Sequence, residues 1–195
     1  MNSGSTIRVS NVSDQPVILR SNPHAVIEEI NRLTRGTAVV ATGVGQHQMW
    51  AAQHYPFDRP RRWITSGGLG TMGFGLPAAI GAQVALPDEL VIDIAGDGSF
   101  EMTLQELSTA QTYGLPVKVV IMNNGYLGMV RQWQEFFYER RYAATPLRSP
   151  DFVKIADAHG LAGFRVDKRP DVQDVVQRAR ATEGSTLIDF RVEQE

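Results

Sequence analysis

The chain has 195 residues, of which 43% are hydrophobic, which is enough for one domain with a buried core. Its 19 basic and 21 acidic residues give a formal net charge of -2, which argues against nucleic acid or an anionic membrane surface as a partner. The absence of cysteine excludes a disulfide framework, a thiolate metal site and a cysteine nucleophile. No stretch has the apolar length of a membrane span or signal peptide, so we expect a soluble, cytoplasmic protein.

The expected elements alternate between helix and strand along the chain. Residues 1–20 are expected to be loosely ordered, and one domain is expected over residues 21–195. Asn22 and Pro23 predict the N-cap and first position of a helix that Gly36 ends. The later helices are expected at residues 47–55, 71–86, 103–114, 125–141, 149–160 and 171–184, and the strands at 37–42, 61–66, 89–96, 116–124, 163–167 and 185–193.

Two of these helices carry specific predictions about how they begin. Thr103 and Glu106 have the spacing of a capping box at the start of the helix at 103–114. Ser149 is expected to be the N-cap of the helix at 149–160, because a serine hydroxyl accepts a hydrogen bond from a free N–H of the first turn.

The strands at 89–96 and 116–124 are apolar at nearly every position, which identifies the type of sheet. An antiparallel strand with one wet face would alternate, whereas a parallel strand covered by helices on both faces would not. The predicted fold is therefore α/β, a three-layer doubly wound domain with a six-stranded, mainly parallel sheet. In such a fold, ligands bind beyond the carboxyl ends of the strands.

Polar residues lie at the ends of two of these strands. Asp97 lies between Gly96 and Gly98 directly after one strand, and the asparagines at 123–124 end the next strand along the chain. A carboxylate, a carboxamide and a backbone carbonyl are hard oxygen ligands that suit Mg²⁺, which completes its octahedron with water and phosphate oxygens. The flanking glycines allow backbone N–H groups to approach an anion, and Ser99 adds a hydroxyl. The two turns together predict a metal-bridged diphosphate site.

Two other interpretations of glycine-rich segments compete with the diphosphate site: a β-hairpin and a dinucleotide-binding loop. Asp-Gly and Asn-Gly are common in β-hairpins, but the apolar residues after both turns have helical spacing, which disfavours hairpins. The sequence GLGTMG at residues 68–73 matches the G-x-G-x-x-G dinucleotide fingerprint. That fingerprint requires an acid at the end of the next strand, whereas Asp93 lies inside the strand, so NAD binding is disfavoured.

The segment GDG, 24 intervening residues and then NN resembles the thiamine diphosphate motif of pyruvate decarboxylase, transketolase and acetolactate synthase. The stretches GVGQHQMWAAQ, GGLGTMGFGLPAAIGA, GDGSFEMTLQEL and NNGYLGMVRQWQEFFYERRY are similar to the catalytic subunit of acetolactate synthase (acetohydroxyacid synthase). The likeness is strong over residues 37–145 and looser outside them. It implies the C-terminal, diphosphate-binding domain of that family, with its thiamine diphosphate-binding fold.

The resemblance also implies roles for particular residues. Asp97 and Asn124 match side-chain ligands of magnesium, and Tyr126 matches a ligand that acts through its backbone carbonyl. The remaining matches are to cofactor-binding residues (Gln46, His47, Gly70, Thr71, Met72, Gly98, Ser99, Met129) and to residues of the substrate channel (Met129, Trp133). From sequence alone, His47 is as readily a packed histidine, and Met72, Met129 and Trp133 are as readily core residues.

The activity that the resemblance implies is decarboxylation of pyruvate and its joining to a second 2-keto acid, in branched-chain amino acid biosynthesis. The family's pyrimidine-binding domain and central flavin domain are not matched in this sequence. We therefore expect thiamine diphosphate and Mg²⁺ but no FAD on this chain. The catalytic acid is expected from a pyrimidine-binding domain or subunit supplied in trans, in a homo- or hetero-oligomer. Alternatives are another thiamine diphosphate decarboxylase or carboligase, or a non-catalytic cofactor-binding module.

Overall fold

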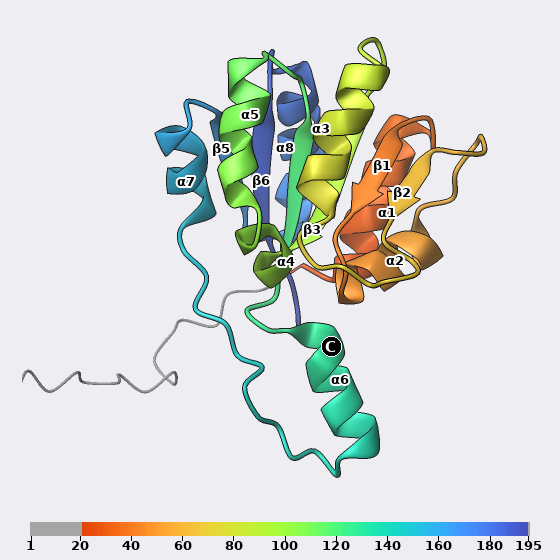
Figure 1. The fold of residues 1–195 in the computed structure, drawn as a ribbon, viewed down its shortest axis with the longest axis vertical. Helices are drawn as coiled ribbons and strands as arrows, with labels where there is room; N and C mark the ends of the chain where they lie inside the picture. Colours follow the sequence, from red (N-terminus) through yellow and green to blue (C-terminus); the bar gives the residue numbers. More distant parts are fainter. Residues whose placement is uncertain (1–20, 195) are drawn as a thin grey trace, which may run out of the picture.

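The computed structural model describes residues 21–194, and these form one sheet flanked by helices (Figure 1). The six strands run in the order β2-β1-β3-β4-β6-β5, and all five neighbouring pairs are parallel. The predicted α/β class and parallel sheet are confirmed, whereas residues 1–20 lie outside the described part. The strands are β1 (Val39–Thr42), β2 (Trp63–Thr65), β3 (Val91–Gly96), β4 (Lys118–Asn123), β5 (Ala162–Val166) and β6 (Thr186–Arg191).

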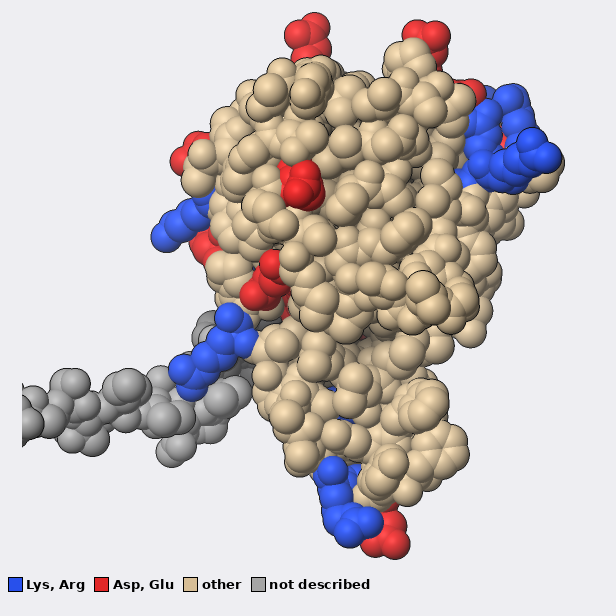
Figure 2. All heavy atoms as spheres, in the orientation of Figure 1, with Lys and Arg blue, Asp and Glu red and all other residues tan. Residues whose placement is uncertain are grey.

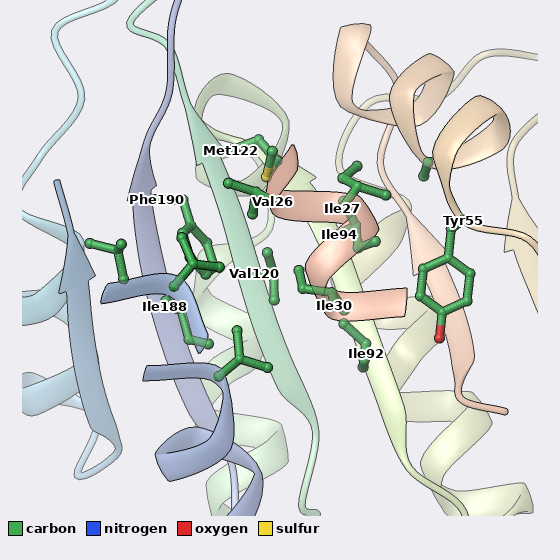
Figure 3. Close-up of a cluster of buried hydrophobic side chains, with 14 of the residues drawn as sticks. Val26, Ile27, Ile30, Tyr55, Ile92, Ile94, Val120, Met122, Ile188 and Phe190 are labelled. Carbon is green, nitrogen blue, oxygen red and sulfur yellow. The ribbon is translucent and has the colours of Figure 1, made fainter. Parts of the chain in front are cut away.

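Helices cover both faces of this sheet, which makes the domain three-layered (Figure 1). One face packs against α1 (Pro23–Thr34), α2 (Gln46–His54) and α8 (Val172–Ala181). Figure 3 shows Ile27 and Ile30 of α1 beside Ile94 and Ile92 of β3, and Val26 beside Met122 of β4. The other face packs against α3 (Gly75–Ala85), α5 (Leu107–Thr112) and α7 (Phe152–Ala158). Because both faces are covered, residues of opposite orientation are buried on β1, β3, β4 and β6, which explains the uninterrupted apolar runs there.

The first helix begins and ends as the sequence predicts. The Asn22 side chain accepts a hydrogen bond from the Ala25 N–H at 3.1 Å, and Pro23 is the first helical residue. At the other end Arg35 and Gly36 both have left-handed φ angles, 54° and 69°. A Cβ at Gly36 would lie 2.7 Å from the Pro56 carbonyl oxygen, so a glycine is required at this turn.

The predicted capping box at residues 103–114 is wrong. The Thr103 hydroxyl donates to the Gly73 carbonyl at 2.9 Å, and Glu106 accepts from the Thr109 hydroxyl at 2.8 Å. The Thr103 side chain thus binds the loop that contains Gly73 and does not cap its own helix. The segment divides into a 3-10 turn at Leu104–Glu106 and α5, preceded by a short helix that sequence reasoning missed, α4 (Asp97–Glu101).

The predicted N-cap at Ser149 is also wrong, because α7 begins at Phe152 and its N-cap is Asp151. The Asp151 carboxylate accepts from the backbone N–H groups of Val153 and Lys154 at 3.1 and 3.3 Å. A carboxylate placed directly before the helix satisfies two free N–H groups, so the serine further upstream is not needed. The Ser149 hydroxyl instead reaches Asp97, at 3.4 Å.

Two other helices are shorter than expected, for reasons of backbone geometry. Helix α3 begins at Gly75 because Gly70 and Gly73 have φ angles of 65° and 78°, which no α-helix accommodates. The helix predicted at 125–141 is α6 (Gly128–Phe137), and left-handed residues at Glu139 and Arg140 follow it. None of the helices within residues 21–194 has the length and apolar character needed to span a membrane.

Candidate functional site

A pocket of about 210 Å³ lies where β3 and β4 end, at the carboxyl edge of the sheet. Its walls come from the start of α2, the loop before α3, the β3–α4 junction and the turn that leads into α6. Sequence reasoning placed ten of its lining residues in one site: Gln46, His47, Gly70, Met72, Asp97, Gly98, Ser99, Asn124, Tyr126 and Met129. The fold thus gathers residues from four separate segments around one cavity.

Asp97 is the first residue of α4 and is 1% exposed. One carboxylate oxygen accepts the Gly98 N–H at 3.1 Å, and the other accepts the Gly125 N–H at 2.9 Å and the Ser149 hydroxyl at 3.4 Å. Burial raises the pKa of Asp97 to about 6, an effect that the hydrogen bonds from Gly98 and Gly125 oppose. These neutral donors join the end of β3 to the turn after β4.

Asn124 extends from the end of β4 into the same pocket and is buried. Its Nδ2 donates to Gln46 Oε1 at 3.3 Å, while its Oδ1 accepts the Tyr126 N–H at 3.0 Å. These two contacts fix the orientation of the Asn124 amide group, since Nδ2 faces an acceptor and Oδ1 faces a donor. A Cβ at Gly128 would fall 1.9 Å from Gln46 Oε1, so the glycine at position 128 makes room for this pair.

His47 lies on the first turn of α2 and is 4% exposed. Among the described residues, its Nε2 has no hydrogen-bond partner. Burial lowers the pKa of His47 to about 3, and the neighbouring Gly43 carbonyl opposes this only in part, so the imidazole is neutral at pH 7. The ring packs on Gly96, where a Cβ would lie 2.6 Å from Nδ1. A buried, unsatisfied nitrogen in a pocket wall is suited to a polar ligand.

Ser99 and Gly98 differ in what they present to the pocket. The Ser99 oxygen accepts the Gly73 N–H at 3.0 Å, which leaves its own proton to be donated. The Gly98 N–H, which we expected to face an anion, is bonded to Asp97 instead. A Cβ at Gly98 would lie 2.8 Å from Leu147 Cδ1, so any larger residue there would push the end of that leucine side chain aside.

Thr71 and Trp133 do not line this pocket. Thr71 is exposed, and its N–H donates to the Ser66 hydroxyl at 3.0 Å. Trp133 is 60% exposed on α6, which projects from the rest of the domain and has no buried residue (Figure 1). In Figure 2 that projection shows mainly uncharged atoms, with charged side chains gathered at its tip. Trp133 is therefore not a core residue in this chain.

Trp133 instead lines a second hollow, of about 630 Å³, that adjoins the pocket. Met129 and Val130 form part of both walls, so the two spaces meet along the first turn of α6. Sequence reasoning missed Val130, Leu127 and Gly128 as lining residues. The spacing of three between Val130 and Trp133 indicated a shared helix face, but nothing local indicated that this face borders a cavity.

The described residues contain no cluster of three or more His, Asp or Glu side chains that could hold a metal. The pocket wall does offer oxygen atoms that could hold a cation, those of the Asp97 carboxylate and the Asn124 amide. That donor set is hard and oxygen-only, which suits Mg²⁺.

Comparison with known proteins identifies the family of the chain. Residues 43–190 match the family described as "Thiamine pyrophosphate enzyme, C-terminal TPP binding domain". The mitochondrial acetolactate synthase catalytic subunit of Saccharomyces cerevisiae is 53% identical over 175 residues, 88% of this chain and 26% of that protein. The Escherichia coli acetolactate synthase isozyme 3 large subunit is 55% identical over 158 residues, 80% of this chain and 28% of that protein.

A plant relative shows the same relationship. Chloroplastic acetolactate synthase 2 of Nicotiana tabacum is 49% identical over 178 residues, 87% of this chain and 27% of that protein. The chain thus spans about a quarter of the length of these relatives. The resemblance inferred from the motifs is confirmed: this chain belongs to the C-terminal thiamine pyrophosphate (TPP) binding domains of thiamine pyrophosphate enzymes and is similar to those of acetolactate synthase catalytic subunits.

Proposed function

We propose that this chain forms the diphosphate-binding part of an acetolactate synthase and holds TPP through a magnesium ion. The observation that carries the proposal is the convergence of Asp97 and Asn124 in one pocket at the ends of two adjacent parallel strands. Family membership supports the TPP part, and the high identity to acetolactate synthases supports the enzyme. The metal and its ligands rest on the chemistry of the pocket.

We assign the magnesium ligands to the Asp97 carboxylate, the Asn124 amide oxygen and the backbone carbonyl of Tyr126. Mg²⁺ binds few protein oxygens and takes the rest of its octahedron from water and phosphate. The carboxylate fits this role because its hydrogen-bond partners are neutral donors, so its negative charge remains to attract a cation. We propose that Gly98 and Ser99 lie against the phosphate oxygens and that the unsatisfied nitrogen of His47, with Gln46 beside it, completes the diphosphate end.

The remaining residues are assigned to the cofactor rings and to substrate. When bound, TPP supplies an electron sink that stabilises the carbanion formed on loss of carbon dioxide from a 2-keto acid. We propose that Gly70, Met72 and Met129 line the cofactor, whereas Thr71, which is exposed outside the pocket, is no longer assigned to it. Met129 and Trp133 would border the substrate channel, because Met129 belongs to the pocket and also to the hollow that contains Trp133.

For the whole enzyme, we propose decarboxylation of pyruvate and its joining to a second 2-keto acid, as a step of branched-chain amino acid biosynthesis. The acid that activates the aminopyrimidine is assigned to a pyrimidine-binding domain or subunit, in an oligomer. Glu106 does not fit that role because it is bonded to Thr109. Cytoplasmic location remains a prediction, since the yeast and tobacco relatives are named as mitochondrial and chloroplastic.

Calorimetry with TPP, with and without Mg²⁺, tests the metal assignment through Asp97→Asn. Removing the negative charge keeps the side-chain volume but weakens the metal cage, so the affinity for TPP with Mg²⁺ should fall by at least about tenfold. Asp157→Asn is the matched control, because Asp157 is exposed on α7. Equal affinities for the wild type and Asp97→Asn would remove Asp97 from the metal site.

A further inference from the structure

The first asparagine of the pair at 123–124 points away from the pocket. Asn123 is 2% exposed and is not part of the pocket wall, whereas Asn124 is. The Asn123 Nδ2 donates to Asp189 Oδ1 at 2.9 Å, a contact between residues 66 positions apart. The two neighbouring asparagines therefore have different partners: Asn124 lines the pocket, whereas the Asn123 side chain binds Asp189 on β6.

Asp189 is buried, with an exposed fraction of 0%, and its second oxygen is also engaged. Oδ2 accepts a hydrogen bond from Arg165 Nε at 3.2 Å and forms an ion pair with Arg191, whose Nε lies 3.3 Å away. Arg165 also reaches Asp151, the N-cap of α7, at 2.6 Å. A buried carboxylate held by two guanidinium groups and an amide has little rotational freedom, because each of its oxygens already has a charged or fixed donor.

The end of β6 holds the asparagine pair at two further points. The Val192 N–H donates to the Asn123 carbonyl at 3.1 Å, and Gln194 Nε2 reaches the Asn124 carbonyl at 3.4 Å. From the opposite side, Gln46 accepts from the Asn124 side chain. The backbone of residues 123–124 is thus held by β6, and the Asn124 amide is oriented by a second contact.

We propose that Asp189 is a positioning residue for the cofactor site: through Asn123 it holds the end of β4 so that Asn124 aims its amide oxygen into the pocket before any ligand binds. This inference rests on the proposed function, in which Asn124 ligates the metal. Metal sites gain affinity when ligand orientation is fixed in advance by a second ring of hydrogen bonds.

The alternative is that the Arg165–Asp189–Arg191 cluster only ties β5, β6 and α7 together. Both interpretations predict a loss of stability when the cluster is altered, so stability alone does not separate them. They differ in what happens to the Asn124 side chain, whose hydrogen bonds to Gln46 and Tyr126 lie outside the charged cluster. Only a positioning role transmits the change to its side chain.

Asp189→Asn is a sharp test because it preserves shape. In this variant the amide oxygen of the new side chain would face the guanidinium groups of Arg165 and Arg191, because they are donors. Its NH₂ would then face the NH₂ of Asn123, so two donors would oppose each other. Asn123→Ala removes the same contact from the other side. Asp151→Asn is the control, since it touches the same Arg165 while asparagine still serves as an N-cap.

The first readout is the side-chain amide signals of Asn124 by ¹⁵N NMR of the ligand-free chain. In the wild type and in Asp151→Asn we expect two separated, slowly exchanging signals. In Asp189→Asn and Asn123→Ala we expect these signals to exchange faster and move toward those of a free asparagine. Unchanged Asn124 signals in both variants, with the fold retained by circular dichroism, would overturn the inference.

The second readout is the Mg²⁺ concentration at half-saturation of TPP binding. Asp189→Asn and Asn123→Ala should each raise this Mg²⁺ concentration by about tenfold. The double variant should raise it no further, because both residues act through one contact. An unchanged midpoint, or additive effects, would count against the positioning role. If the wild-type chain binds no TPP with Mg²⁺, the proposed function fails, whereas the NMR signals of the ligand-free chain still decide this inference.

Discussion

The Asp97 carboxylate accepts a hydrogen bond of 2.9 Å from the backbone N–H of Gly125. This single contact joins the first residue after β3 to the turn after β4, two segments 28 positions apart. It places the oxygens of Asp97 beside the turn that carries Asn124. The oxygen donors that we assign to magnesium are thus brought together by the fold of the protein itself.

Gly128→Ala should damage the site more than the fold. The new Cβ would lie 1.9 Å from Gln46 Oε1, so Gln46 must move and release Asn124. We expect the affinity for TPP with Mg²⁺ to fall by about tenfold, measured by calorimetry.

The matched control is Gly81→Ala in α3, where a Cβ meets nothing within 4 Å. It should leave TPP affinity unchanged and raise the free energy of unfolding by roughly 0.5 to 1 kcal/mol, because alanine loses less backbone entropy in a helix. Equal TPP affinity for both variants would contradict the role given to Gln46.

Asp93→Asn should increase stability, and by more as the pH rises. Asp93 is 0% exposed on β3, neither of its oxygens has a partner among the described residues, and burial raises its pKa to about 8. Between the unfolded pKa of about 3.9 and that value, the folded state holds a proton that the unfolded state has lost. The contribution of Asp93 to the unfolding free energy of the wild type is therefore fully present below pH 4, and it is lost as the pH rises toward 8.

The measurement is urea unfolding of wild type and Asp93→Asn at several pH values between 4 and 8. The difference in unfolding free energy should grow by about 1.4 kcal/mol per pH unit in that window, in favour of the variant. Parallel stability curves would show that Asp93 is ionised in the folded protein.

Trp133→Ala should cost little stability. Trp133 is 60% exposed, whereas Trp50 on α2 is 5% exposed and belongs to the core. Truncation of a buried tryptophan costs roughly 3 to 5 kcal/mol, so Trp50→Ala should unfold at much lower denaturant concentration than Trp133→Ala. Similar losses in denaturant melts would place Trp133 in the core of the protein in solution.

The 195-residue chain, saturated with TPP and Mg²⁺, should form acetolactate slowly until a separately expressed pyrimidine-binding domain is added. The acid that we assign to that domain contributes proton transfer, which is worth about 10² to 10⁴ in rate. The check is an assay of acetolactate formed from pyruvate with and without the added domain. Fast turnover without it would direct attention to Glu101, whose partly buried carboxylate has an unsatisfied oxygen among the described residues.

The sequence by itself determined the sheet and the location of the site. Apolar runs without alternation indicated strands covered on both faces, and the helical spacing after Asp97 and Asn124 disfavoured hairpins. Because carboxyl ends of parallel strands share one edge, two polar strand ends were enough to predict one pocket. The cap at Asn22 was equally predictable, since all of its contacts lie within one helical turn.

Only the tertiary structure decided which partners the polar side chains choose. Thr103 and Ser149 have the residue type of helix caps, yet both bind distant groups, because a hydrogen bond to Gly73 or Asp97 became available once the chain had folded. The space that Gly128 leaves for Gln46, and the attachment of Asn123 to Asp189, likewise join segments with no local pattern in common. Local propensity describes what a residue does among its neighbours in sequence, whereas these contacts depend on neighbours that folding alone supplies.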